Sequence, residues 1–337
     1  MSDPLETQPF QAPPPPPQPA PEEPARRPTR LRPFAIGFFV LGLIVLVGGI
    51  VNFIPGGKGT GASLCLFGLA LFGGSFIPLP RVPDTEPAIP AVEKFAGMFF
   101  EPTRIFKNLR IHPHWIAAYI LVTLLAVIYS FAFVQRVTPE RIVNHTVDKI
   151  GQMGPPFAPP PEMLDQMRVN QLEDLKNPIQ RAGTVAKTFV FSFIGASFIS
   201  ALYLLGVLAF GGRINFWQAL AVYFHASVPV VIVSKILSLV ILYLKAPEDI
   251  HPILGQDNLV QDNLGILFSP ANHPVFFVLA SAIGILSLYS LWLKAKGLHH
   301  GGTRVSSTAG WGVGITFWLL GLLLVTIITA LFPGFIG

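Results

Sequence analysis

The sequence is poor in cysteine and in charged residues. Its 337 residues include one cysteine, Cys65, which excludes a framework of internal disulfides. Charged residues make up 12% of the chain, against roughly 25% in a usual soluble domain. Apolar residues make up 51%. This composition excludes an ordinary soluble domain and favours a protein that has the lipid bilayer as its solvent.

Carboxylates are missing from the long apolar runs. Ionisable groups at membrane depth mark ion pathways and proton relays, so their absence argues against a coupled pump. Paired intramembrane aspartates and an HExxH zinc motif are also absent from the sequence. Gly195-Ala196-Ser197 resembles an intramembrane serine-protease motif, but Phe198 follows where a glycine is needed. We therefore expect a non-enzymatic protein with no cofactor and no metal site.

Apolar residues are gathered in blocks of the length that crosses a hydrocarbon layer of about 30 Å, which is about 20 residues of helix. We therefore predict an all-α integral membrane protein with about seven transmembrane helices. Two form an N-terminal hairpin (33–80), whose glycines allow close approach of the helices, and five follow. The predicted spans are Phe34–Ile54, Ala62–Leu79, His114–Val134, Thr188–Phe210, Phe216–Leu244, Pro274–Leu293 and Ala309–Phe332.

The segments outside these spans are polar or rich in proline. Residues 1–32 contain the run Pro13–Pro17 and little apolar surface, which predicts a disordered tail. The first apolar run lacks a cleavage site, so we expect it to stay as a signal anchor. Residues 135–187 form a long polar loop with a helical pattern at Glu162–Leu175. The repeat QDNL at 256 and 261 does not fit a calcium loop and is typical of a solvated loop or a cap.

Basic residues flank the spans on one side. With the N-terminus in the cytoplasm, the inner segments hold most of the Lys and Arg outside the 135–187 loop, as the positive-inside rule requires. The C-terminus then lies outside. The formal charge of +5 is explained by this membrane orientation and needs no nucleic-acid partner.

Residues 91–112 form an amphipathic segment. Apolar residues recur there at intervals of three or four residues, which places them on one helical face. Pro102 divides the segment into two short helices. Two readings remain open and are compatible: the segment lies in the interface against anionic lipid, or it packs on the inner ends of the bundle. The candidate residues for lipid or partner contact are Arg104, Lys107, Arg110 and Trp115.

One span carries ionisable residues. His225 lies near mid-depth, one turn before Pro229, which loosens the backbone ladder around it. His225, Ser227 and Pro229 form a candidate intramembrane polar site; the alternative is a neutral histidine bonded to a neighbouring helix. Lys235 lies about 28 Å along the same helix, near the outer interface, where it can snorkel.

Three sequence blocks resemble the Yip family (Ypt/Rab-interacting protein domain), bacterial branch, from about Phe99 to the C-terminus. They are FFEPTRIFKNLRIHPHW from Phe99, GGRINFWQALAVYFHASVPVVI from Gly211 and ILSLYSLWLKAKGL from Ile285. The resemblance implies a five-helix membrane core; eukaryotic relatives are membrane scaffolds that engage small GTPases. The chain departs from the family at Gly284 or Ile285, where an Asp is common, and the hairpin and the 135–187 loop are additions.

From these observations we expect a membrane scaffold or adaptor that organises lipids or partner proteins through its inner face. The alternative is a channel or facilitator for a small neutral solute. The expected partners are the lipid bilayer, anionic lipids and other membrane proteins. The expected location is the inner membrane of a bacterium.

Overall fold

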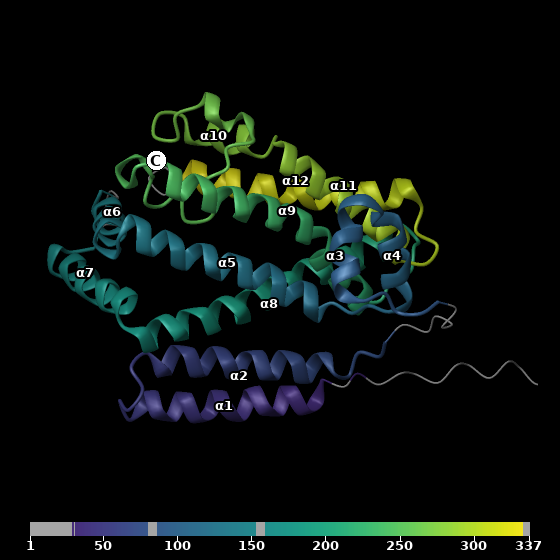
Figure 1. Ribbon diagram of the computed structural model, residues 1–337, viewed down its shortest axis with the longest axis horizontal. Helices are drawn as coiled ribbons and strands as arrows, with labels where there is room; N and C mark the ends of the chain where they lie inside the picture. The colour runs from purple at the N-terminus through teal and green to yellow at the C-terminus, as the bar shows by residue number, and fades with distance from the viewer. Residues whose placement is uncertain (1–28, 30, 80–85, 153–158, 333–337) are drawn as a thin grey trace, which may run out of the picture.

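The computed structural model describes residue 29 and residues 31–79, 86–152 and 159–332. Most of the predicted tail (1–32) lies outside these ranges. Within them the regular structure is helical, and the long helices run along one axis of the molecule (Figure 1). These helices are α1 (Arg32–Ile50), α2 (Gly57–Gly74), α5 (Ile116–Val137), α8 (Pro178–Ala209), α9 (Phe216–Leu244), α11 (Ile285–Gly301) and α12 (Ser307–Leu331).

Five helices of the described ranges, α1, α5, α8, α9 and α12, are long and apolar enough to cross a membrane. This confirms the prediction of an all-α, multi-span membrane protein. Helix α2 begins with the polar, glycine-rich sequence GKGTG, and the remaining predicted span is divided into two shorter helices. The total of seven spans stays a prediction.

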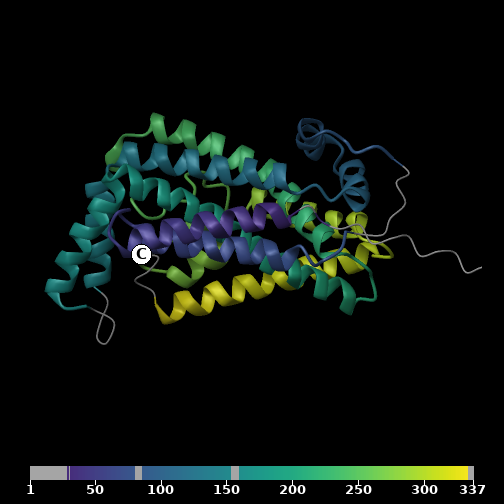
Figure 2. The ribbon, with the colours of Figure 1, turned by 90° about the horizontal axis from the view of Figure 1, so that it is seen from below.

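The N-terminal hairpin is closely packed, as its glycines predict. A Cβ atom added to Gly42 in α1 would lie 2.5 Å from the backbone nitrogen of Cys65 in α2. A Cβ atom added to Gly61 would lie 2.3 Å from the nitrogen of Leu46. Both distances are shorter than van der Waals contact, so only glycine permits this approach. The hairpin lies along one side of the bundle, nearly parallel to its helices (Figures 1 and 2).

The predicted continuous span Pro274–Leu293 is wrong. The structure has a short helix α10 (Pro274–Ser281), a break, and then α11, which continues to Gly301. At the break, Gly284 forms an antiparallel bridge with Asn263, and the nitrogen of Leu264 donates to the oxygen of Ile283 at 3.1 Å. A loop that returns to the bundle therefore takes backbone bonds that a continuous helix would use internally.

Both copies of the QDNL repeat contact helices, so of the two alternatives, a solvated loop or a cap, the contacts favour the cap. In the first copy, the side-chain oxygen of Asn258 accepts from the hydroxyl of Ser238 in α9. Lys235 donates to the backbone oxygen of Asp257 in the same copy, as its predicted place near the outer interface allows. In the second copy, Asp262 binds the start of α11.

The segment after α5 contains two helices outside the bundle, α6 (Pro139–Gly151) and α7 (Pro161–Lys176). The second agrees with the pattern predicted at Glu162–Leu175. Ion pairs hold the two helices together, Arg168 to Asp148 at 2.9 Å and Lys176 to Glu140 at 2.5 Å.

The described chain begins and ends at opposite ends of the bundle (Figure 1). Two short helices, α3 (Ala91–Phe100) and α4 (Pro102–Ile111), cover the end where α1 begins. We call these two helices the collar. Helices α6 and α7 lie at the other end, where α12 finishes.

Candidate functional site at the collar

The collar is two helices because of one proline. Glu101 has φ −132° and ψ 52° between the helices, outside the helical region. Pro102 then begins α4, where its missing N–H would have no intrahelical acceptor anyway. The predicted break at Pro102 is confirmed.

The apolar face of the collar packs on the bundle. Met98, Ile105, Phe106 and Leu109 are fully buried. Phe106 lies against α11, because a Cβ atom on Gly297 would come within 2.9 Å of its ring. Of the two readings of segment 91–112, packing on the end of the bundle is the one that this burial shows.

Some apolar side chains of the collar remain uncovered. Val92 is 79% exposed and Phe100 is 84% exposed, both in α3. Large exposed apolar groups on an otherwise packed helix are suited to the membrane interface. One face of the collar therefore packs on the bundle, and the exposed apolar residues of α3 can contact something else.

The three basic residues of α4 do not share one environment. Arg104 donates to Glu93 at 2.8 Å and to Glu101 at 3.3 Å, and its side chain is 57% exposed. These hydrogen bonds, first the one to Glu93, raise the pKa of Arg104. Two carboxylates thus balance the charge of Arg104 on the side of α4 that faces α3.

Lys107 and Arg110 instead lie close to the last turn of α11, where their positive charges act on His300. The pKa of His300 is lowered to about 4, first by burial and then by the positive charges of neighbouring groups, which are His299, Lys107, Lys296 and Arg110. No carboxylate is among the groups that shift it. We call Lys107, Arg110, Lys296, His299 and His300 the basic cluster. Sequence reasoning named the first two, but the partners on α11 follow only from the packing of α4 against α11.

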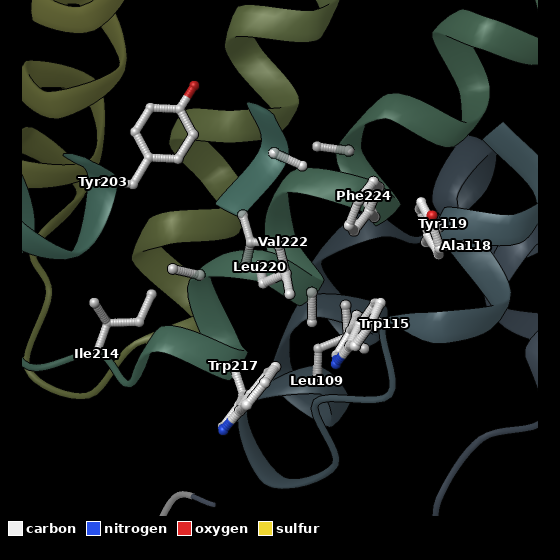
Figure 3. Packing of buried hydrophobic residues seen from close by; sticks show 14 of the residues in the cluster. Leu109, Trp115, Ala118, Tyr119, Tyr203, Ile214, Trp217, Leu220, Val222 and Phe224 are labelled. Carbon is white, nitrogen blue, oxygen red and sulfur yellow. The ribbon is translucent and has the colours of Figure 1, made fainter. Parts of the chain in front are cut away.

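Trp115 belongs to the core rather than to an open surface. It is 7% exposed, and its ring is stacked on that of Trp217 at 6.1 Å with an interplanar angle of 8° (Figure 3). It also lines an apolar groove between the hairpin and helices α5 and α8. Contact of Trp115 with a lipid would take place through this groove.

Trp217 was not anticipated from the sequence, although the local signal is present. Asn215 and Gln218 form a capping box at the start of α9 and so place Trp217 in its first turn. The indole nitrogen of Trp217 donates to the oxygen of Ile77 at 2.9 Å, and the Asn215 side chain donates to Pro78 at 3.0 Å. These bonds join the end of the hairpin to the core.

The candidate polar residues of α9 are bonded within their own helix. His225 is buried, with its Nδ1 atom 2.9 Å from the oxygen of Ala221. The Ser227 hydroxyl donates to the oxygen of Tyr223 at 2.8 Å. Pro229 lies inside α9, which continues past it to Leu244.

Two titratable side chains at the collar end lie close enough to His225 to act on it electrostatically. They are Lys94 of α3 and His114, just before α5. Lys94 is 2% exposed, and burial lowers its pKa to about 8. Burial, then Lys94 and then His112, lower the pKa of His114. A buried lysine on an amphipathic helix is not visible in the sequence pattern, which assigns charged residues to the solvent face.

A comparison with known families assigns most of the chain to one family. A family model described as Yip1 domain matches residues 96–328. That range runs from the collar through most of α12 and leaves out the hairpin. No curated protein matches the chain, and no solved structure matches it. Within the described ranges, no three His, Cys, Asp or Glu side chains group as a metal-ligand set.

Proposed function

Since the chain belongs to the Yip1 domain family, we propose that it is a non-enzymatic membrane scaffold that gathers acidic lipids at its collar end. The observation that carries this proposal is the basic cluster. Helices α4 and α11 bring five basic or titratable side chains together, and the charges that act on His300 are all positive. Such an uncompensated cluster attracts phosphate groups.

The orientation predicted from the basic residues is consistent with the same role. The collar end would face the cytoplasm of a bacterial inner membrane, where the leaflet surface is negative. The cluster and the uncovered Val92 and Phe100 would then meet the headgroups and the apolar boundary of that leaflet. A reporter fused to the C-terminus tests this orientation, because activity of the reporter in the cytoplasm would contradict it.

The experiment uses full-length protein in phosphatidylcholine nanodiscs, which leave the collar end open to solution. Co-flotation with phosphatidylglycerol vesicles measures binding. Each basic residue near an acidic surface contributes roughly 1 kcal/mol, so the double variant Lys107→Gln/Arg110→Gln is expected to bind about 30-fold more weakly. Binding should also weaken with added salt.

Arg104→Gln is the matched comparison on the same helix. Because Glu93 and Glu101 already balance Arg104, its replacement should have a smaller effect than the replacement of Lys107 or Arg110. Equal binding to phosphatidylcholine and phosphatidylglycerol vesicles, or unchanged binding by the double variant, would contradict the lipid role. If the same variant instead lost a protein captured from native membranes, the cluster would be a protein-binding surface.

A facilitator for a small neutral solute is the second candidate. The buried Lys94 and His225, with the exposed His114 beside them, favour it, because these side chains lie together at the collar end of α5 and α9. Pro229 also removes one backbone donor from α9 beside this group. A His225→Leu variant with altered solute flux in proteoliposomes would support this role, and flux equal to that of empty vesicles would exclude it.

A further inference from the structure

A cavity of about 700 Å³ lies between helices α8, α9, α10, α11 and α12, away from the collar surface. Its walls are mostly apolar and include Phe277, Phe317, Trp318 and Leu322. This volume falls within the range of ligand sites, about 300–1,000 Å³. A site of this size and lining suits a large apolar group.

The cavity has a single cation in its wall, Lys294 of α11. Its Nζ atom lies 5.8 Å from the centre of the Tyr223 ring. Tyr203 and Tyr223, from α8 and α9, also line the cavity and lie close enough to interact electrostatically. Among the described residues, no acid is paired with Lys294 and no acceptor binds either phenol hydroxyl. Burial lowers the pKa of Lys294, and a bound anion would favour its charged form. The Lys294 amine and two O–H donors are therefore free for an oxyanion.

Lys294 lies at one end of the cavity. Next to it, Ala295 packs against Gly314 of α12, where an added Cβ atom would be 3.6 Å from that of Ala295. The wall formed by α12 continues from Gly314 to Val325, which is about 16 Å of helix at 1.5 Å per residue. The site is thus charged at the collar side and apolar along its length toward the other end of the bundle.

We propose that this cavity binds an acidic phospholipid, with one acyl chain along α12 and a phosphate oxygen at Lys294. The cavity has its cation, Lys294, at one end and an apolar wall along the rest. The ligand likewise has its anionic group at one end and its acyl chain along the rest, so the two are complementary. A neutral solute would leave Lys294 without a counter-charge and would not use the apolar wall. The site is separate from the basic cluster and does not depend on the function proposed for it.

The test uses full-length protein in phosphatidylcholine nanodiscs that contain phosphatidylglycerol with a photoactivatable group at the end of one acyl chain. Mass spectrometry locates the crosslinks. We expect them on α12 between Phe317 and Val325, with an excess of unlabelled phosphatidylglycerol competing and phosphatidylcholine not competing. Lys294→Gln removes a charge-assisted hydrogen bond and should lower the crosslink yield about tenfold, whereas Lys294→Arg should retain most of it.

A second variant narrows the cavity without changing its charge. Gly321 lines the cavity, and a Cβ atom there would have no atom within 4 Å, so Gly321→Leu fits the fold and should abolish the crosslinks. The matched controls are Lys187→Gln and Gly195→Leu on α8, which lie outside this cavity. Each variant is first checked for a monodisperse peak in detergent.

The outcomes are distinct. Crosslinks that persist in Gly321→Leu, or that fall equally in the control variants, overturn the cavity as the site. Equal competition by phosphatidylcholine, or unchanged yield in Lys294→Gln, overturns the choice of an acidic lipid. Lys107→Gln/Arg110→Gln should leave these crosslinks intact, so failure of the surface proposal and failure of the cavity proposal can be told apart.

Discussion

The carboxylate of Asp262 accepts a hydrogen bond of 2.6 Å from the backbone N–H of Leu286. Leu286 lies in the first turn of α11, whose N-cap residue, Gly284, has no side chain to offer. Asp262 therefore caps α11 from a separate loop. The apolar runs hold no acid of their own, but this loop brings one to a helix end inside the predicted span Pro274–Leu293.

Removal of this cap should destabilise the break. Asp262→Ala loses an N-terminal hydrogen bond and a negative charge at the positive end of α11, which together contribute about 1–2 kcal/mol. Asp262→Asn should retain part of the effect. Thermal unfolding in detergent measures both, and Asp257→Asn, at the equivalent position of the first QDNL copy, serves as the control. Equal midpoints for Asp262→Ala and the control would contradict the cap.

Gly284 should not tolerate a side chain. A Cβ atom there would lie 2.9 Å from the Cβ of Asn263 and 3.2 Å from the Asp262 carboxylate. We expect Gly284→Ala to cost about 1–3 kcal/mol, because the loop must shift away from α11. Gly73→Ala in α2, where a Cβ atom meets nothing within 4 Å, should be neutral or slightly stabilising. The two unfolding curves are compared directly.

Trp217 should hold the hairpin to the core through its ring and its N–H. Trp217→Phe retains much of the ring and loses the hydrogen bond to Ile77, at a cost of about 1 kcal/mol. Trp217→Ala also removes the stack with Trp115 and should cost about 3–5 kcal/mol. Thermal unfolding in detergent gives both values. A smaller loss for Ala than for Phe would show that the stack does not stabilise the fold.

Stability should fall in mild acid because of His300. Its pKa is lowered to about 4 in the folded protein, whereas an unperturbed histidine titrates near 6.5. Between these pH values the unfolded chain binds more protons than the folded chain, so stability decreases as pH falls through this window. The difference between the unfolding midpoints at pH 7 and pH 5 should be smaller in a His300→Gln variant, and the remainder is expected from other histidines with a lowered pKa, such as His114. An identical pH dependence in that variant would contradict the assignment.

Local patterns decided much of the architecture. Blocks of about 20 apolar residues predict membrane helices because their length matches the bilayer, and α1, α5, α8, α9 and α12 confirm them. Pro102 predicts the division of the collar because a proline has no N–H to donate at any place in a fold. Glycine spacing likewise predicts the close hairpin, since it depends on neighbours in the same two helices.

Local sequence patterns predicted only part of the candidate site. The sequence placed Arg104, Lys107 and Arg110 on one short helix, but it could not assign carboxylates to Arg104 and α11 to the other two. Those environments depend on which elements pack against α4. The sequence named Trp115 as a candidate for lipid or partner contact, and its place in the core follows only from its stack with Trp217, 102 positions later.

The sequence by itself determined the membrane class, the helical hairpin and the divided collar, because each follows from chain-local length, periodicity or donor chemistry. Only the tertiary structure decided the break before α11, the basic cluster and the cavity beside Lys294. Each of these depends on contacts between residues distant in the chain, such as Asn263 with Gly284. Local hydropathy carries no information about such pairing.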